Sequence, residues 1–223
     1  MKNNTVIYTA IFGGYDRLIE PVEPSKDIDY ICFTDGLSKF TSEAWKIEIV
    51  EPHFKKDMVR SARLIKICPH RFLGQYEYSL WIDGSRQLIS APDVPSLLTG
   101  KTIAMEKHRS RRCVYVEAET CKEQRRDDPK IIDQQIAAYK KLGLPKRAGL
   151  YATYMIARKH GNMELILLNE EWWKHLCEYS RRDQISLPVV FYRYPIENIS
   201  STIRRKIIRT KRHSHKGRRN GKF

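Results

Sequence analysis

The feature that most constrains the fold is an alternation of short apolar runs with helical segments along the whole chain. Residues 6–12 and 29–34 are rich in Val, Ile, Tyr and Phe and are bounded by glycine or polar residues, which predicts buried parallel strands. Similar runs predict further strands at residues 45–51, 78–83, 87–89, 101–108 and 151–158.

Helical patterns fill the spaces between these runs. The pattern from residue 58 predicts a helix that stops at Pro69, and residues 114–142 hold two helical patches broken by Pro129 and ended by Gly143. Residues 162–180 form the clearest helix. Because strands and helices alternate without a repeat or linker, we expect one α/β domain with a mainly parallel sheet flanked by helices.

The charge of the chain is uneven, and this divides it into a body and a tail. Ten of the lysines and arginines lie in residues 204–223, so the net charge of +15 leaves only +5 for residues 1–203. Such a cationic tail binds anionic surfaces, either nucleic acid or the inner face of a membrane. With Ile203, Ile207 and Ile208 among its cations, the tail is predicted to be partly disordered or to form an amphipathic element on a membrane.

The composition of the chain argues against several classes of protein. The apolar runs are too short to span a bilayer, and the five cysteines, without a C-x-x-C pair, favour reduced thiols over disulfides or a zinc knuckle. The N-terminus has no signal-peptide cleavage pattern, so we expect a cytoplasmic protein, peripheral on the inner face of the cytoplasmic membrane if the tail docks there.

The stretch YSLWIDGS ends a predicted strand on a single carboxylate, Asp83, before Gly84 and Ser85. A carboxylate held rigidly at the end of a strand is well placed to bind Mg²⁺ or Mn²⁺, which take one or two protein carboxylates and leave other positions to substrate phosphates. The alternative is that Asp83 caps the turn through the amides of Gly84 and Ser85.

Polar residues also follow the first two predicted strands, in FGGYD and FTDG. Ligands of open α/β sheets bind at the carboxyl ends of strands, and paired glycines allow close backbone approach, although a plain turn also explains them. Upstream of Asp83, Arg60, Arg63 and Lys66 recur along one flank of a helix. They would clamp a diphosphate or form a solvated basic face.

The stretch that contains these residues and ends in WIDGS resembles the metal-binding region of GT-A-fold glycosyltransferases. The strand, the helix with paired tryptophans and the Asp183-Gln184 pair that follow resemble the acceptor half of retaining family-8-type enzymes. Together, YTAIFGGYD, DYICFTD, LWIDGS and RDQIS most resemble the TOD/MUCI-type glycosyltransferase-like domain, over residues 5–195. In contrast to Asp-x-Asp, the second acid is replaced by Ser85.

The resemblance implies roles for specific residues. Asp183 and Gln184 would face the sugar and the acceptor, with Asp183 orienting the acceptor hydroxyl or acting as base, and Asp83 would stabilise the leaving phosphate, with a divalent cation if one binds. Ser85 and either His213 or His215 would complete the metal site, unless these histidines are merely solvated. The donor nucleotide would lie against Thr9, Ala10, Phe12, Gly13, Tyr15, Asp16, Asp35, Arg60, Arg63 and Lys66.

A second polar group, His108, Arg112 and Glu117, would line the acceptor pocket or form a surface salt-bridge lattice. The resulting hypothesis is a hexosyltransferase-like enzyme that moves sugar from a nucleotide-diphosphate sugar to a glycan or lipid-linked acceptor in surface polysaccharide synthesis. The alternatives are a nucleic-acid-binding protein without catalysis, disfavoured because no nucleic-acid motif is found, and a degenerate nucleotide-sugar-binding domain.

Overall fold

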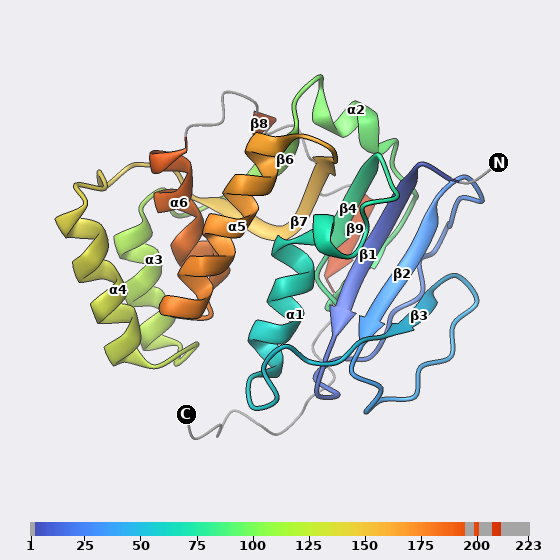
Figure 1. Ribbon diagram of the computed structural model, residues 1–223, viewed down its shortest axis with the longest axis horizontal. Coiled ribbons are helices and arrows are strands. Elements are labelled where there is room, and N and C mark those ends of the chain that lie inside the picture. Colours follow the sequence, from blue (N-terminus) through green and yellow to red (C-terminus); the bar gives the residue numbers. More distant parts are fainter. Residues whose placement is uncertain (1–2, 195–198, 201–206, 211–223) are drawn as a thin grey trace.

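The computed structural model describes residues 3–194, 199–200 and 207–210 (Figure 1). Its strands are β1 Thr5–Ile11, β2 Asp29–Thr34, β3 Lys46–Ile49, β4 Tyr78–Ile82, β5 Arg86–Leu88, β6 Ile103–Lys107, β7 Tyr151–Lys159, β8 Ile199–Ser200 and β9 Ile208–Thr210. Its helices are α1 Met58–Ile67, η1 Pro69–Arg71 (a 3₁₀ turn), α2 Val94–Leu98, α3 Val114–Glu123, α4 Pro129–Lys141, α5 Met163–Glu178 and α6 Asp183–Arg193.

The main sheet has seven strands in the order β3-β2-β1-β4-β7-β6-β8. All of its strands share one direction except β7, which pairs antiparallel with both β4 and β6. The predicted mainly parallel α/β sheet is therefore confirmed. The direction of β7 was not predicted, because a run of buried apolar residues reads the same in a parallel or an antiparallel strand.

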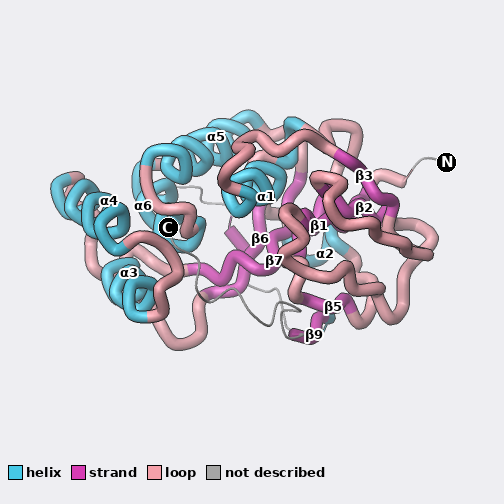
Figure 2. Tube along the Cα trace, turned by 90° about the horizontal axis from the view of Figure 1, so that it is seen from below, coloured by secondary structure: helices cyan, strands magenta, loops and turns pink. Residues whose placement is uncertain are grey.

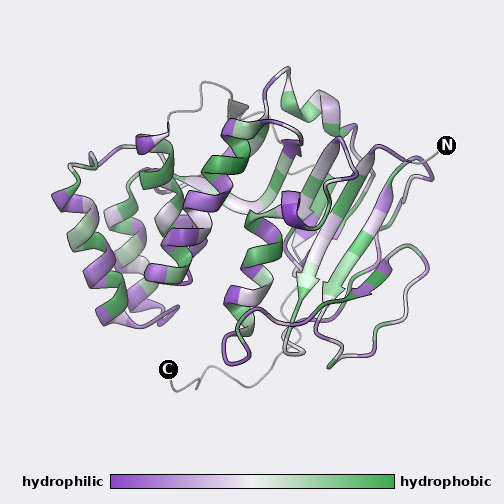
Figure 3. Cartoon of the chain, viewed as in Figure 1, coloured by the Kyte–Doolittle hydropathy of each residue, from purple (hydrophilic) through white to green (hydrophobic). Residues whose placement is uncertain are grey.

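Both faces of the sheet are covered, as Figure 2 shows with α1 and α5 on one side and β5, β9 and long loops on the other. Alternate residues of β1 enter different cores: Val6 and Tyr8 pack with the helices, whereas Ile7 and Ile11 pack on the opposite face. Burial on both sides explains why the strands are apolar along their length, which is visible as green and white strands between purple loops in Figure 3.

The helix boundaries follow local chemistry, as expected. The side chain of Asp57 accepts a hydrogen bond from the Arg60 amide and caps α1, which ends before Pro69. Pro129 is the first residue of α4, where its missing N–H costs nothing, and Gly143 follows that helix with a φ of 77°. The predicted breaks at both prolines and the glycine are confirmed.

The described part of the tail folds back onto the body. β9 pairs antiparallel with β5, and Ile207 and Ile208 pack against the core on the β5 side of the sheet. Because both side chains are partly buried against the protein, the structure disfavours the prediction that these two isoleucines face a membrane. Ile203 and the remaining basic residues of the tail lie outside the described residues.

Two expectations from composition can be compared with the structure. In the part of the chain that the structure describes, no helix combines the length and apolar character that crossing a bilayer requires. The five cysteines are all free thiols, as predicted.

Candidate functional site

Asp83 stands directly after β4, and the backbone around it is firmly held. Its amide donates to the carbonyl of Tyr154 on β7 at 2.9 Å, and Trp81 Nε1 donates to Asp83 Oδ1 at 2.8 Å. The turn is closed by the Arg86 amide, which donates to the Asp83 carbonyl at 2.8 Å, so the carboxylate is not the capping group. The Asp83 side chain remains 28% exposed. The strand thus delivers a fixed, accessible carboxylate.

Two cations of α1 join this carboxylate to a second one, Asp183. Lys66 Nζ lies 3.2 Å from Asp83 Oδ1 and 2.6 Å from Asp183 Oδ2. The Arg63 guanidinium lies farther away, with NH1 3.7 Å from Asp83 Oδ1 and Nε 3.6 Å from Asp183 Oδ1. The lysine is fully buried between the two acids. We call Arg63, Lys66, Asp83 and Asp183 the charged cluster.

Burial and neighbouring charges act in opposite directions on the acids of the cluster. Burial would raise the pKa of Asp183, but Arg63, Lys66 and Arg182 outweigh it and hold the pKa well below its usual range. Burial acts in the same way on Asp83, and Lys66 and Arg63 again lower its pKa. For Lys66, burial and the neighbouring Arg63 lower the pKa, against the attraction of both carboxylates. Each group therefore depends on the others for its charge.

Asp183 is the first residue of α6, and its backbone is fixed by a tryptophan. Trp172 Nε1 on α5 donates to the Asp183 carbonyl and to Ser186 Oγ, both at 3.0 Å. Gln184 is also held, because its Nε2 donates to the Tyr151 carbonyl at 2.9 Å. A carboxylate with so low a pKa accepts a proton poorly, so the role of general base expected for Asp183 is disfavoured.

Arg60 does not join the cluster, although it lies on the same helix. Its guanidinium donates to Asp57, to the Leu176 carbonyl and to the Tyr179 carbonyl, so that Nε, NH1 and NH2 are all engaged. These bonds tie α1 to the end of α5. Arg60 is therefore a structural residue, and we leave it out of the proposed donor site.

The loops after β1, β2 and β4 meet, as predicted from their sequence. Gly13, with a φ of 64°, donates its amide to Asp35 Oδ2 at 2.6 Å. A Cβ added at Gly84 would lie 3.2 Å from Ile11 Cγ1 and 3.7 Å from Asp16 Cβ, so the turn after Asp83 fits closely against the first loop. The three strand ends therefore border one site.

The other residues predicted to bind the nucleotide differ in how far their side chains are exposed to solvent. Thr9 and Phe12 are buried, and Phe12 belongs to the core, so its ring is less accessible to a base than that of Tyr15. Ala10 is partly buried on β1. Tyr15 is 54% exposed and is thus the aromatic ring that remains accessible beside Asp16.

The polar side chains predicted to group around His108 and Glu117 do so, but with Arg111 in place of Arg112. Arg111 Nε donates to Glu117 Oε2, and the Arg111 amide donates to His108 Nδ1 at 3.0 Å, whereas Arg112 is exposed. Burial and the charge of Arg111 lower the pKa of His108. Against the effect of burial, the charges of Asp183 and Glu117 raise the pKa of Arg182, so this arginine interacts electrostatically with both acids. The sequence pattern indicated neither Arg111, Arg182 nor the role of Trp172.

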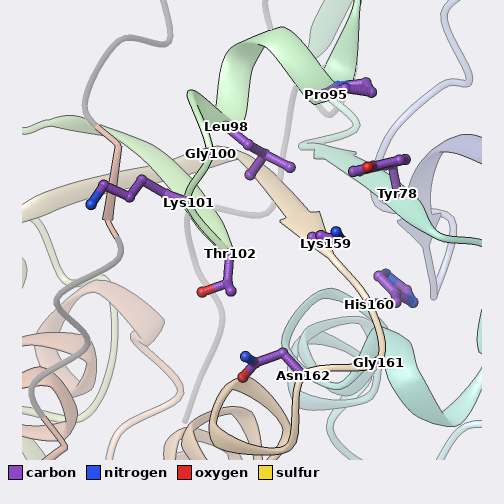
Figure 4. A pocket seen from close by; sticks show the side chains of 10 residues that line it. All are labelled: Tyr78, Pro95, Leu98, Gly100, Lys101, Thr102, Lys159, His160, Gly161 and Asn162. Carbon is purple, nitrogen blue, oxygen red and sulfur yellow. The ribbon is translucent and has the colours of Figure 1, made fainter.

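A cavity of about 400 Å³ lies elsewhere in the described structure. Its lining includes Tyr78 at the start of β4, Lys159 at the end of β7, and His160 and Asn162 just beyond, as Figure 4 shows. Because β4 and β7 are antiparallel, these residues lie at the edge of the sheet opposite Asp83. The cavity therefore does not belong to the charged cluster.

His160 beside this cavity makes the stability of the fold depend on pH. Burial, Arg158 and His70 lower the pKa of His160 from 6.5 to about 4. Between these values the unfolded chain binds a proton that the folded chain does not, so the free energy of unfolding falls as the pH drops through this window. We expect a loss of about 1–2 kcal/mol between pH 7 and pH 5 from this group.

Urea denaturation at the two pH values measures this loss, and His160→Gln should remove it. The matched control is His53→Gln, which removes a histidine that packs against Phe54 and Trp173 in another part of the fold. Equal pH dependence in the wild type and in His160→Gln would contradict the assignment.

Comparisons with known proteins agree with this architecture. The apo structure of WbbM, described as a bifunctional glycosyltransferase, superposes with a TM-score of 0.51 at 14% identity, over 89% of this chain and 38% of that one. The probable hexosyltransferase MUCI70 of Arabidopsis thaliana is 27% identical over 216 residues, which cover 83% of this chain and 36% of the plant protein. The chain thus spans little more than a third of either relative's length.

The fold is that of glycosyltransferases, with the polar loops of parallel strands gathered around Asp83. The family model of the TOD1/MUCI70 glycosyltransferase-like domain matches residues 1–213, nearly the whole chain. The chain therefore belongs to the TOD1/MUCI70 family, as the four sequence blocks predicted.

Proposed function

We propose that this chain is a glycosyltransferase that transfers a hexose from a nucleotide-diphosphate sugar to a hydroxyl group of a glycan. The observation that carries the proposal is the position of Asp83, which lies at the end of β4 within reach of Arg63 and Lys66 and beside the loop after β1. Family membership and the hexosyltransferase relative support it. A rigid cluster of charges serves a reaction in which charge develops on a leaving diphosphate.

In this proposal, the loops after β1 and β2 receive the nucleoside. Tyr15 supplies an exposed ring for the base, and Asp16 supplies an acceptor for ribose hydroxyls. Asp35 already accepts hydrogen bonds from the amides of Gly13 and Leu37, so its role is to shape the loop. The diphosphate then lies toward Arg63 and Asp83.

The acceptor enters from the side of α6 and α3. Gln184 follows Asp183 at the start of α6, and His108 with Arg111 and Glu117 forms a polar wall connected to the cluster through Arg182. Polar groups of this kind suit the hydroxyls of a sugar. We further propose that this sugar is lipid-linked and contributes to a surface polysaccharide. Transfer to an acceptor bound to vesicles would test this.

A thermal-shift screen against UDP-, GDP- and CMP-sugars, followed by measurement of donor hydrolysis, tests the proposal. We expect one donor to stabilise the protein and to be hydrolysed slowly. Asp83→Ala should lower the hydrolysis rate by about 100-fold or more, since it removes the carboxylate that holds Arg63 and Lys66 in position for the diphosphate. Asp83→Asn should do the same while keeping an acceptor for Trp81 Nε1, which separates chemistry from folding.

The control variant is Asp27→Ala, because Asp27 is exposed in the loop before β2. It should match the wild type in stability and rate. Binding of nucleic acid with no response to any donor would instead favour the non-catalytic alternative. A donor that binds without turnover would indicate a degenerate site.

A further inference from the structure

Relatives of the GT-A type imply a divalent cation at the diphosphate, so the residues beside Asp83 need to be tested as ligands. The second acid of Asp-x-Asp is Ser85, whose neutral hydroxyl is a weak ligand for Mg²⁺ or Mn²⁺. The other carboxylate of the cluster, Asp183, is buried and paired with Lys66 at 2.6 Å. The histidines expected to complete the site, His213 and His215, lie outside the described residues.

Among the described residues, the only group with three potential ligand atoms close together is Cys68, His70 and Glu170. Asp83 is not part of this group, and Glu170 already accepts hydrogen bonds from Arg71 and His70. Burial also raises the pKa of the Cys68 thiol to about 12, which disfavours the thiolate that a metal requires. This group therefore does not supply the missing cation site.

The charges around Asp83 also oppose a cation. Asp83 Oδ1 accepts from Trp81 Nε1 and faces Lys66 Nζ at 3.2 Å, and Arg63 NH1 is 3.7 Å away. With Arg182 near Asp183, three protein cations surround two carboxylates in the described structure. A divalent ion bound about 2.1 Å from an Asp83 oxygen would lie within a few ångströms of these like charges. The described residues around Asp83 therefore do not fit a metal.

Arg63 has the properties of a group that receives an anion instead. Its contacts with Asp83 and Asp183 are loose, at 3.7 Å and 3.6 Å, and its buried Nε has no hydrogen-bond acceptor within the described structure. Its side chain is 19% exposed. A guanidinium group can donate two parallel hydrogen bonds to phosphate oxygens. Lys66 is fully buried and can act only through its charge, without touching the phosphate.

We propose that Arg63, supported by Lys66, neutralises the leaving nucleoside diphosphate in place of a divalent cation. The inference rests on the proposed function. In the transfer, the bond from the anomeric carbon to the diphosphate oxygen breaks and leaves its electron pair on that oxygen. The acceptor hydroxyl oxygen bonds the anomeric carbon and releases its proton to solvent. Arg63 contacts the diphosphate as its charge increases, and Lys66 positions Asp83 and Asp183.

The test compares the full chain in EDTA with the same chain in millimolar Mn²⁺ or Mg²⁺. UDP and GDP serve as calorimetric probes, and UDP-hexoses and GDP-hexoses as hydrolysis substrates. We expect affinity and hydrolysis rate in EDTA to remain within about twofold of the values with metal. Activity or binding that appears only with metal would overturn the inference while leaving the proposed function intact. Absence of nucleotide binding in both conditions would overturn both.

Variants of Arg63 extend the test. Arg63→Lys keeps the charge but loses the paired donors, and should lower hydrolysis about 10- to 100-fold; Arg63→Met should lower it further. The matched control is Arg126→Lys, an exposed arginine in the α3–α4 turn, which should behave as the wild type. Arg63→Met with wild-type turnover in EDTA would contradict the role of Arg63. Circular dichroism of each variant excludes unfolding as the cause of a loss.

Discussion

Replacing Asp183 by Asn is expected to lower donor hydrolysis by about 100-fold, with much less effect on nucleotide affinity. Asp183 holds Lys66 at 2.6 Å and raises the pKa of that buried lysine. Without its charge, burial and Arg63 lower the lysine pKa further, so the charged form of Lys66 becomes less favoured. The remaining charged form increases as the pH falls, and the residual activity of the variant should rise in the same direction.

The measurement is kcat and KM for hydrolysis across a pH series, since a purely structural loss would not change the shape of the profile. Asp127→Asn is the matched control, because Asp127 is likewise buried and accepts the Arg181 amide at 2.7 Å but lies outside the cluster. It should lower stability and leave kcat unchanged. A rate for Asp183→Asn equal to the wild type would show that the cluster is not part of the reaction.

Trp172→Ala should destabilise the protein by about 3–5 kcal/mol, because it empties a large buried site in the core. Trp172 is fully buried, and its Nε1 also holds the start of α6 through the Asp183 carbonyl and Ser186 Oγ. Trp172→Phe retains most of the ring but loses both hydrogen bonds, and should cost about 1–3 kcal/mol. Urea denaturation monitored by circular dichroism gives these values.

The neighbouring Trp173 provides the control. It packs in the same core beside Phe54, but unlike Trp172 it makes no hydrogen bond to α6 in the described structure. We expect Trp172→Phe to lower activity as well as stability, because Asp183 loses the bond that fixes its backbone. If the two phenylalanine variants lose equal activity, Trp172 has no role in positioning α6.

The α/β fold could be predicted because its elements have local signals: apolar runs for β1, β2 and β4, and the proline and glycine boundaries of α1 and α4. The direction of β7 and the pairing of β9 with β5 are set by contacts between distant segments. For example, Arg86 lies opposite Thr210. Nothing in a short window of residues indicates such a partner.

For the candidate site, the sequence predicted which strand ends meet but not which side chains pair with one another. Strand ends meet at one edge of a parallel sheet, so Asp83 and the loop after β1 were expected together. The spacing along α1 could not show that Arg60 has a different role from Arg63 and Lys66. Spacing alone does not reveal which carbonyls or acids face each side of the helix. Likewise, the choice of Arg111 over Arg112 depends on a fold that brings Glu117 near.

The pairing of β9 with β5 also imposes an order on folding. β5 begins three residues after Asp83, and its Leu88 is buried in the core that Ile207 and Ile208 help to cover. During synthesis, this patch remains uncovered until residues 207–210 have left the ribosome. Closure of such a long loop is slow. The strand that follows the Asp83 turn therefore gains its partner strand late.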